Sequence, residues 1–212
     1  MNVTSHKLPR LHIVSSGREH LDMPGRALCQ AAAIARSGPV IFQLREKGLA
    51  ASSLYDIACR LRGVLDTSKS LLMVNERADI AQASGADGIH LPEDSCPLPG
   101  IRKAFPGLIA GRSVHSLGAA VEAEKSGAGY LLFGPVFATP SKERFGPPKG
   151  LDELAEVCRT VSIPVYAVGG ITPERSLACI EQGAWGIAAL GPFLDVEALP
   201  STIETYRAYL PT

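Results

Sequence analysis

The chain has 212 residues, of which 46% are hydrophobic, and it carries 21 basic and 21 acidic residues. This length can bury one sizeable core and lies near the lower end of the range for a single barrel domain. The balanced charge argues against a nucleic-acid partner and a polybasic membrane patch, and no apolar stretch is long enough to span a bilayer.

Short aliphatic or β-branched segments alternate with helical patterns along nearly the whole chain. Strands are predicted at 11–15, 40–44, 71–75, 88–91, 108–112, 130–136, 164–168 and 186–190, and helices around 24–37, 50–63, 77–84, 98–105, 117–126, 150–160, 173–182 and 195–209. Strands that are apolar on both faces and separated by single helices are typical of a parallel sheet covered by helices. This pattern favours an α/β fold with one (β/α)8 TIM barrel over 1–212, in which 1–10 form a short N-terminal extension.

The residues that leave the second predicted strand suit an anionic ligand. In such a barrel the functional groups follow the C-terminal ends of the strands. Alternation places Gln43, Arg45 and Lys47 on one face. A planar guanidinium beside an ammonium group can bind an anion, although a solvated pair of charges is an equal alternative.

Acidic residues follow the third and fourth predicted strands. Asn75 and Glu76 leave the third strand, and Asp94 lies shortly after the fourth. Glu76 and Asp94 could hold Mg²⁺ against a ligand phosphate, or they could cap the helices that follow. Spacing alone favours capping.

Ser113 and His115 leave the fifth predicted strand, and Thr139 and Lys142 lie beyond the sixth. A histidine at the mouth of a barrel can take and return a proton near neutral pH, although a lone histidine is more often a hydrogen-bonded structural residue. The charged segment 139–150 is rich in Pro and Gly and is the best candidate for a mobile lid. Lys142 could close onto an anion with this lid, or remain a solvated loop residue.

The seventh and eighth predicted strands each run into a glycine turn and then a helix start. The first turn contains Gly169, Gly170 and Ile171, and the second contains Gly191. In this position of a barrel, backbone N–H groups and a helix N-terminus bind a phosphate monoester, and glycine lets the backbone approach the phosphate oxygens. Each turn alone could be an ordinary turn, but together they predict a phosphate site.

These motifs, taken as a set, resemble the thiamine phosphate synthase superfamily from the second predicted strand to the eighth. The resemblance is carried by Gln43-x-Arg45-x-Lys47, Asn75-Glu76, the segment 85–90, Gly134-Pro135-x-Phe137-x-Thr139-x-x-Lys142 and the segment 167–171. It implies a (β/α)8 barrel that acts on a thiazole phosphate. The superfamily has two main branches, thiamine phosphate synthase and thiazole tautomerase.

The two branches differ at the metal motifs. Synthases carry Asn-Asp after the third strand and Gly-Gln-x-Asp after the histidine of the fourth, whereas this chain has Glu76 and a shortened segment 91–94. In the tautomerase branch the catalytic histidine falls at His115. This chain shares Arg45 and Lys47 with the synthase branch, in which diphosphate binding would require both cations.

We therefore expect a thiazole tautomerase in which His115 moves a proton to aromatise a carboxythiazole phosphate without a cofactor. One alternative is a thiamine phosphate synthase with Mg²⁺ on Glu76 and Asp94. The other is a non-catalytic barrel that binds a phosphate ligand. The expected partner is the small-molecule thiazole phosphate, and a homo-oligomer stays open. The beginning of the chain lacks the apolar run of a signal peptide, and its five cysteines are scattered, so we expect a cytoplasmic protein with reduced thiols.

Overall fold

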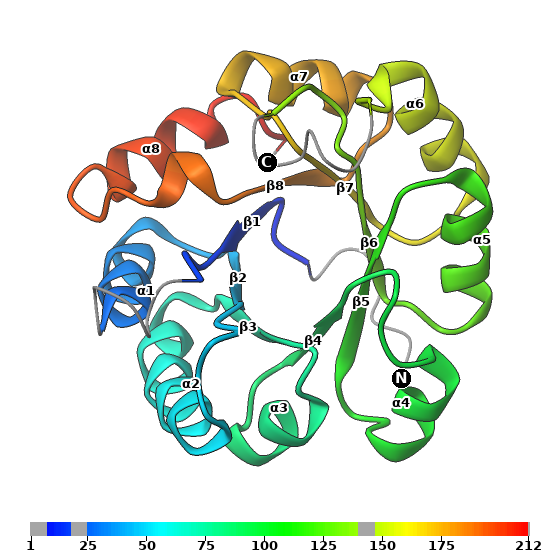
Figure 1. Cartoon of the computed structure of the whole chain (residues 1–212). Helices are drawn as coiled ribbons and strands as arrows, with labels where there is room; N and C mark the ends of the chain where they lie inside the picture. Colours follow the sequence, from blue (N-terminus) through cyan, green and yellow to red (C-terminus); the bar gives the residue numbers. More distant parts are fainter. Residues whose placement is uncertain (1–7, 18–24, 140–146, 212) are drawn as a thin grey trace.

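The chain folds into a closed barrel of eight parallel strands that pair in chain order, with β1 also pairing to β8. The computed structural model describes residues 8–17, 25–139 and 147–211. Figure 1 looks along the barrel, and the helices form a ring outside the strands. The predicted (β/α)8 fold is confirmed.

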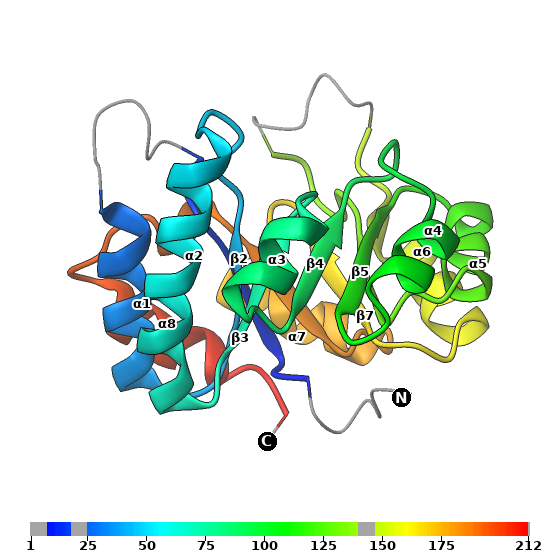
Figure 2. The ribbon, with the colours of Figure 1, turned by 90° about the horizontal axis from the view of Figure 1, so that it is seen from below.

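The elements follow one another as strand and helix. The strands are β1 (Leu11–Val14), β2 (Ile41–Leu44), β3 (Leu71–Asn75), β4 (Gly88–Leu91), β5 (Ile109–Val114), β6 (Tyr130–Phe133), β7 (Val165–Val168) and β8 (Gly186–Ala189). The helices are α1 (Arg26–Ser37), α2 (Ala51–Leu65), α3 (Ala78–Ser84), α4 (Leu98–Ala104), α5 (Leu117–Lys125), α6 (Gly150–Thr160), α7 (Pro173–Glu181) and α8 (Leu199–Arg207), with 3₁₀ turns η2 (Asp66–Ser68) and η4 (Gly191–Phe193). In Figure 2 the barrel is seen from the side, with α1, α2 and α8 next to one another.

Two of the differences between predicted and observed element ends have clear local reasons. The sixth strand was expected to run to residue 136 but ends at Phe133, because Pro135 has no N–H group to donate to a neighbouring strand. The last helix was expected from residue 195 but begins at Leu199. The Asp195 carboxylate accepts the backbone N–H groups of Glu197 and Ala198 and so forms a turn ahead of the helix.

Aromatic rings fill the interior of the barrel. His12, His90, Tyr130 and Tyr166 lie with neighbouring ring centroids 5.6 to 6.0 Å apart. Gly111 makes room for one of these rings, since a Cβ at this position would lie 2.1 Å from Cζ of Tyr130. The missing side chain at position 111 of the neighbouring strand β5 therefore provides the space for the Tyr130 ring inside the barrel.

Residues 8–10 close the end of the barrel opposite the site described below. The indole N–H of Trp185 donates to the carbonyl of Leu8 at 3.1 Å, and the Tyr166 hydroxyl donates to the carbonyl of Pro9 at 2.7 Å. The guanidinium of Arg10 lies 3.7 Å from the Trp185 ring centroid. These contacts tie the start of β1 to β7 and β8.

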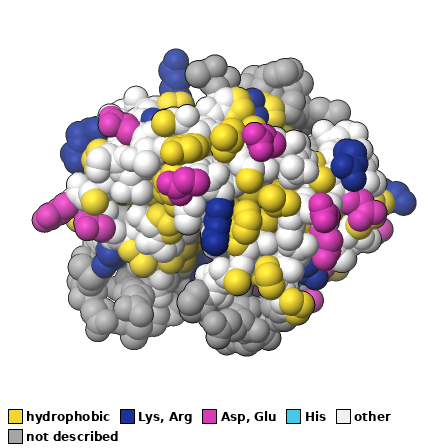
Figure 3. Space-filling view, turned by 90° about the horizontal axis from the view of Figure 1, so that it is seen from above, with side chains coloured by type: hydrophobic (Ala, Val, Ile, Leu, Met, Phe, Trp, Pro, Cys, Tyr) yellow, Lys and Arg dark blue, Asp and Glu magenta, His cyan; other side chains and the backbone are white. Residues whose placement is uncertain are grey.

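Apolar and charged side chains share the outer surface in the view over α6, α7 and α8 (Figure 3). Figure 3 shows apolar patches there that charged side chains separate. Among the described residues, none of the helices combines the length and apolarity needed to cross a membrane.

Candidate active site

A buried hydrogen-bond chain runs from the barrel interior to the carboxyl ends of β2 and β3. His12 Nε2 lies 3.0 Å from Gln43 Oε1, and Gln43 Nε2 donates to Asn75 Oδ1 at 2.8 Å. Asn75 Nδ2 then donates to Glu76 Oε2 at 2.8 Å. Because the Gln43 amide turns its carbonyl oxygen toward His12, Nε2 of His12 must carry the hydrogen. Burial lowers the pKa of His12 to about 3, so this ring is neutral at physiological pH.

An ion pair lies at the end of this hydrogen-bond chain, at the mouth of the barrel formed by the carboxyl ends of the strands. Lys47 Nζ lies 3.1 Å from Glu76 Oε2, and the two side chains are 55% and 37% exposed. The backbone of Glu76 has a φ of 61°, which is uncommon for a residue with a side chain. Of the three residues predicted to share one face, Gln43 is buried, Arg45 is half-buried and Lys47 lies at the surface.

Arg45 and Lys47 flank a buried glutamate that the sequence analysis did not single out. Glu46 Oε1 accepts the Ser15 hydroxyl at 2.5 Å and the backbone N–H of Gly17 at 2.9 Å. Ser15 Oγ in turn accepts the backbone N–H of Arg45 at 2.9 Å. Glu46 therefore fixes the segment that carries both cations. Alternation places Glu46 on the face opposite to Arg45 and Lys47. This position in the pattern is the sequence signal that could have separated Glu46 from the two cations.

A second buried chain joins three consecutive strands, β4, β5 and β6. The Tyr130 hydroxyl lies 3.1 Å from His90 Nδ1, and His90 Nε2 lies 2.8 Å from Ser113 Oγ. Tyr130 and His90 are at most 2% exposed, whereas Ser113 is half-buried near the end of β5. Desolvation lowers the pKa of His90 well below its usual value, so this ring is also neutral.

His115 lies at the mouth between a backbone carbonyl and a carboxylate. Its Nδ1 is hydrogen-bonded to the carbonyl oxygen of Gly134, and its Nε2 lies 3.7 Å from Glu93 Oε2. A carbonyl only accepts, so Nδ1 carries a hydrogen and Nε2 is the position that can take or return a proton. The imidazole is 39% exposed, which leaves it accessible from solution.

Glu93, which the sequence analysis did not single out, supplies the carboxylate beside His115. Asp94 is exposed, and no contact in the described structure joins it to Glu76. Arg112 holds this loop by donating to the carbonyls of Glu93 and Cys96, the latter at 3.0 Å. The loop has no periodic pattern, so the sequence could not show which of two adjacent acids turns toward the histidine.

The two glycine turns lie at the carboxyl ends of the adjacent strands β7 and β8. Gly169 and Gly170 have φ values of 97° and 65°, and α7 begins shortly afterwards with Thr172 as its N-cap. A Cβ on Gly170 would lie 2.7 Å from the carbonyl oxygen of Ala138. A Cβ on Gly191 would meet no atom within 4 Å. The first turn is thus packed against the loop after β6, and the second is open.

Arg175 is a further cation near the first turn that the sequence analysis did not identify. Its guanidinium donates to the carbonyl of Gly170 at 2.7 Å and lies 4.7 Å from the Phe137 ring centroid. The buried Tyr206 hydroxyl donates to the carbonyl of Ile171 at 2.9 Å. Both contacts hold carbonyl oxygens of this turn, which leaves its N–H groups as the candidates for a phosphate.

The predicted lid lies partly outside the residues that the structure describes. Thr139 is half-buried after β6, whereas Lys142 lies outside the described residues, as do 140–146 of the predicted 139–150 lid. Within the described ranges, no group of three or more His, Cys, Asp or Glu side chains could hold a metal ion.

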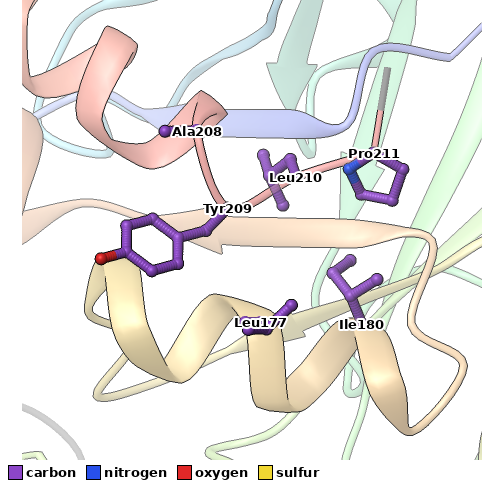
Figure 4. Close-up of a pocket in the computed structure, with 6 residues that line it drawn as sticks. All are labelled: Leu177, Ile180, Ala208, Tyr209, Leu210 and Pro211. Atoms are coloured by element: carbon purple, nitrogen blue, oxygen red, sulfur yellow. The ribbon is translucent and has the colours of Figure 1, made fainter.

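A separate apolar groove of about 480 Å³ lies on the outside of the barrel (Figure 4). Leu177 and Ile180 of α7 face the residues that follow α8, and the rest of its lining is Ala208, Tyr209, Leu210 and Pro211. This lining has no charged group and only one titratable one. The groove therefore offers little chemistry in comparison with the barrel mouth.

The fold and the mouth together define a (β/α)8 barrel protein whose cations, carboxylates and glycine turns gather at the carboxyl ends of the strands. Comparison with known proteins assigns its family. The model of the thiamine monophosphate synthase family matches residues 11–192, and the chain belongs to this family. It is therefore an enzyme of thiamine biosynthesis.

Relatives from bacteria and archaea carry synthase names. The chain is 41% identical over 189 residues to the putative thiamine-phosphate synthase 2 of Aquifex aeolicus, covering 89% of this chain and all of that protein. It is 38% identical over 178 residues to the thiamine-phosphate synthase of Methanoculleus marisnigri, covering 84% and 81% of the two chains. A solved structure of the thiamine phosphate pyrophosphorylase from Pyrococcus furiosus matches with a TM-score of 0.82 and 29% identity, covering 97% and 96%. These names favour the synthase alternative over the tautomerase, although they do not separate the two branches.

Proposed function

We propose that the chain is a transferase that joins a pyrimidine methyl diphosphate to a thiazole phosphate. In this reaction the thiazole nitrogen bonds to the methylene carbon while the bond from that carbon to the diphosphate oxygen breaks. Thiamine phosphate and inorganic diphosphate are the products. The observation that carries the proposal is the Lys47–Glu76 pair, which stands 3.1 Å apart at the ends of the neighbouring strands β2 and β3. The synthase names of the relatives support it.

The cations of the mouth suit a departing diphosphate. Lys47 is 55% exposed and can move its ammonium group from Glu76 onto a diphosphate oxygen. Arg45 lies on the same segment, which Glu46 holds in place. Ser113 is positioned to donate to a further oxygen. Such preorganised donors stabilise negative charge as it develops on a leaving group.

Synthase chemistry implies a magnesium ion, and the donor set fits it in kind. Glu76 follows β3 and Asp94 follows the neighbouring strand β4, and both are carboxylates with exposed surface. Mg²⁺ is commonly held by one or two carboxylates together with substrate phosphates. When bound by Glu76 and Asp94, the ion would supply positive charge to the diphosphate.

The thiazole phosphate would bind on the other side of the mouth. Backbone N–H groups of the turns at Gly170 and Gly191 would hold its phosphate. The turns belong to adjacent strands, which is the arrangement that phosphate-binding barrels use. Thr139, which follows β6, would contact the same substrate or the diphosphate.

A specific observation favours thiazole tautomerase as the second candidate. The Gly134 carbonyl fixes the Nδ1–H form of His115, which leaves Nε2 as a base beside Glu93. A base in this form could remove a proton from a ring carbon and return one to an exocyclic carbon. The synthase reaction does not require a proton shift between two carbons.

The two candidates differ in their substrates and in their need for metal. Purified protein is assayed with the pyrimidine diphosphate plus thiazole phosphate, and separately with the carboxythiazole phosphate, each with Mg²⁺ and with EDTA. We expect thiamine phosphate from the first mixture, abolished by EDTA and reduced at least a hundred-fold in Glu76→Gln, as is common when a group that stabilises the transition state is removed. Glu156→Gln, an exposed residue of α6, removes the same charge far from the mouth and should leave the rate unchanged.

Each other outcome has a distinct meaning. Turnover of the carboxythiazole phosphate in EDTA, without thiamine phosphate formation, would establish the tautomerase and reject the transferase. Binding of thiazole phosphate without turnover of either substrate would identify a non-catalytic barrel.

A further inference from the structure

The Tyr130 side chain is completely buried inside the barrel. The proposed chemistry gives its hydroxyl no role. This hydroxyl begins the chain that passes through His90 to Ser113 at the mouth. The three residues come from β6, β4 and β5, which lie next to one another in Figure 1. A buried residue on one strand is thereby connected to an accessible hydroxyl on another.

The direction of the hydrogens along this chain follows from the Tyr130 hydroxyl. A buried O–H group needs an acceptor, and in the described part of the chain its hydrogen-bond partner is Nδ1 of His90. If Tyr130 donates to Nδ1, the hydrogen of the neutral imidazole must lie on Nε2. Nε2 then donates to Ser113 Oγ at 2.8 Å.

The hydroxyl hydrogen of Ser113 is consequently available to a ligand. Its oxygen accepts from His90, so its single hydrogen points elsewhere. The reversed chain would have Ser113 donate to His90 and would leave the Tyr130 hydrogen buried without an acceptor. Desolvation raises the pKa of Tyr130 well above its usual value, so the phenol keeps its hydrogen.

We propose that Tyr130 is a positioning residue which, through the tautomer of His90, fixes the Ser113 hydroxyl as a donor to anionic phosphate or diphosphate oxygens at the mouth. The inference rests on the proposed function, because it assumes that such an anion binds beside Ser113. A hydroxyl whose oxygen accepts from a histidine keeps its single hydrogen for the anion, whereas one that donates to the histidine has no hydrogen left for it.

The chain offers a matched control in Tyr166. Both tyrosines are buried in the same ring cluster, with centroids 5.6 Å apart. The Tyr166 hydroxyl, however, donates to the Pro9 carbonyl at the closed end of the barrel. Tyr130→Phe and Tyr166→Phe therefore remove the same atom from similar surroundings, but only the first interrupts the chain to Ser113.

The first measurement is the tautomer of His90, read from the ¹⁵N shifts of the histidine ring and assigned with His90→Gln. We expect the Nε2–H form in the wild type and in Tyr166→Phe, and a mixture of the two neutral forms in Tyr130→Phe. Thermal denaturation shows that each variant is folded before its spectrum is interpreted. An Nδ1–H form in the wild type, or an unchanged Nε2–H form in Tyr130→Phe, would overturn the inference.

The second measurement is calorimetric titration with inorganic diphosphate in the presence of Mg²⁺. We expect Tyr130→Phe and Ser113→Ala each to weaken binding about tenfold, the usual effect of losing one hydrogen bond to a charged group. The double variant should bind no more weakly than Ser113→Ala alone, because Tyr130 acts through Ser113. Multiplied losses in the double variant would show that Tyr130 acts by another route and would reject the proposal.

The two measurements also separate this inference from the proposed function. A wild type that shows the Nε2–H tautomer but no diphosphate binding would contradict the proposed function and, with it, the role of Ser113 as an anion donor. Diphosphate binding that Tyr130→Phe leaves unchanged would contradict the role of Tyr130 alone.

Discussion

Substitution by alanine is expected to lower the stability of the fold at Gly170 and the affinity for ligand at Gly191. At Gly170 the backbone φ of 65° strains any residue with a Cβ by about 1–2 kcal/mol. The new methyl group would also lie 2.7 Å from the Ala138 carbonyl oxygen and 2.8 Å from Phe137 Cβ, so the loop after β6 must move. Overpacking of this kind costs about 1–3 kcal/mol. Gly170→Ala should therefore lower the free energy of unfolding by about 2–5 kcal/mol.

Gly191→Ala should leave the fold intact and weaken the ligand. Its Cβ would meet no atom within 4 Å, so the free energy of unfolding should change by less than about 0.5 kcal/mol. The methyl group would instead occupy space beside the backbone N–H of Gly191 itself, because Pro192 has no N–H and that of Phe193 donates to the Leu190 carbonyl at 3.0 Å. We expect affinity for thiazole phosphate to fall about tenfold, as for the loss of one hydrogen bond to a charged group.

Urea unfolding followed by circular dichroism, together with calorimetric titration of thiazole phosphate, measures both effects. Wild-type stability in Gly170→Ala would show that the packing against Ala138 is not as tight as the geometry indicates. Wild-type affinity in Gly191→Ala would show that the phosphate does not contact the turn after β8. Either result would refute the corresponding half of the reasoning.

Two further predictions concern the histidines. His115→Ala should reduce any tautomerase activity by about a hundred-fold to ten-thousand-fold while the carboxythiazole phosphate still binds, and single-turnover rates with a binding titration would test this. Retention of full activity would return His115 to a structural role. The second prediction follows from the burial that lowers the pKa of His12 to about 3. The unfolded chain binds a proton at this position below about pH 6.5 while the folded chain does not, so stability is fully present above that pH and falls as pH drops toward 3. Urea midpoints at pH 7 and pH 5 should differ more in the wild type than in His12→Gln, and equal differences would contradict the burial of a neutral ring.

The order of the elements could be predicted because each strand is a short apolar run and each helix has its own pattern and end signals. Gly38, Gly85 and Gly127 all adopt positive φ at helix ends, as glycines after helices commonly do. The inside of the barrel could not be predicted in the same way. Strands such as β6 are buried on both faces, so hydrophobicity does not show that Tyr130 points into the barrel while its neighbour Leu131 packs against the helices.

The candidate site was predicted where it depends on strand ends and missed where it depends on loops and partners. The strand-end rule placed Lys47 and Glu76 at the mouth, where they form an ion pair. The contact between Glu93 and His115 depends on how an irregular loop turns, and the contact between Arg175 and Gly170 depends on one helical position. Neither leaves a periodic signal in the sequence.

The close approach of Gly111 to the Tyr130 ring links two positions that are far apart along the chain. A methyl group at position 111 would lie 2.1 Å from Cζ of Tyr130, which is far too near for both to coexist without movement. The phenol can therefore be kept only while position 111 stays glycine. We expect the two positions to change together in related chains, so that a larger residue at 111 accompanies a smaller one at 130. Chains that have made this exchange would lack the phenol hydroxyl and would need another acceptor or donor to orient the histidine of β4.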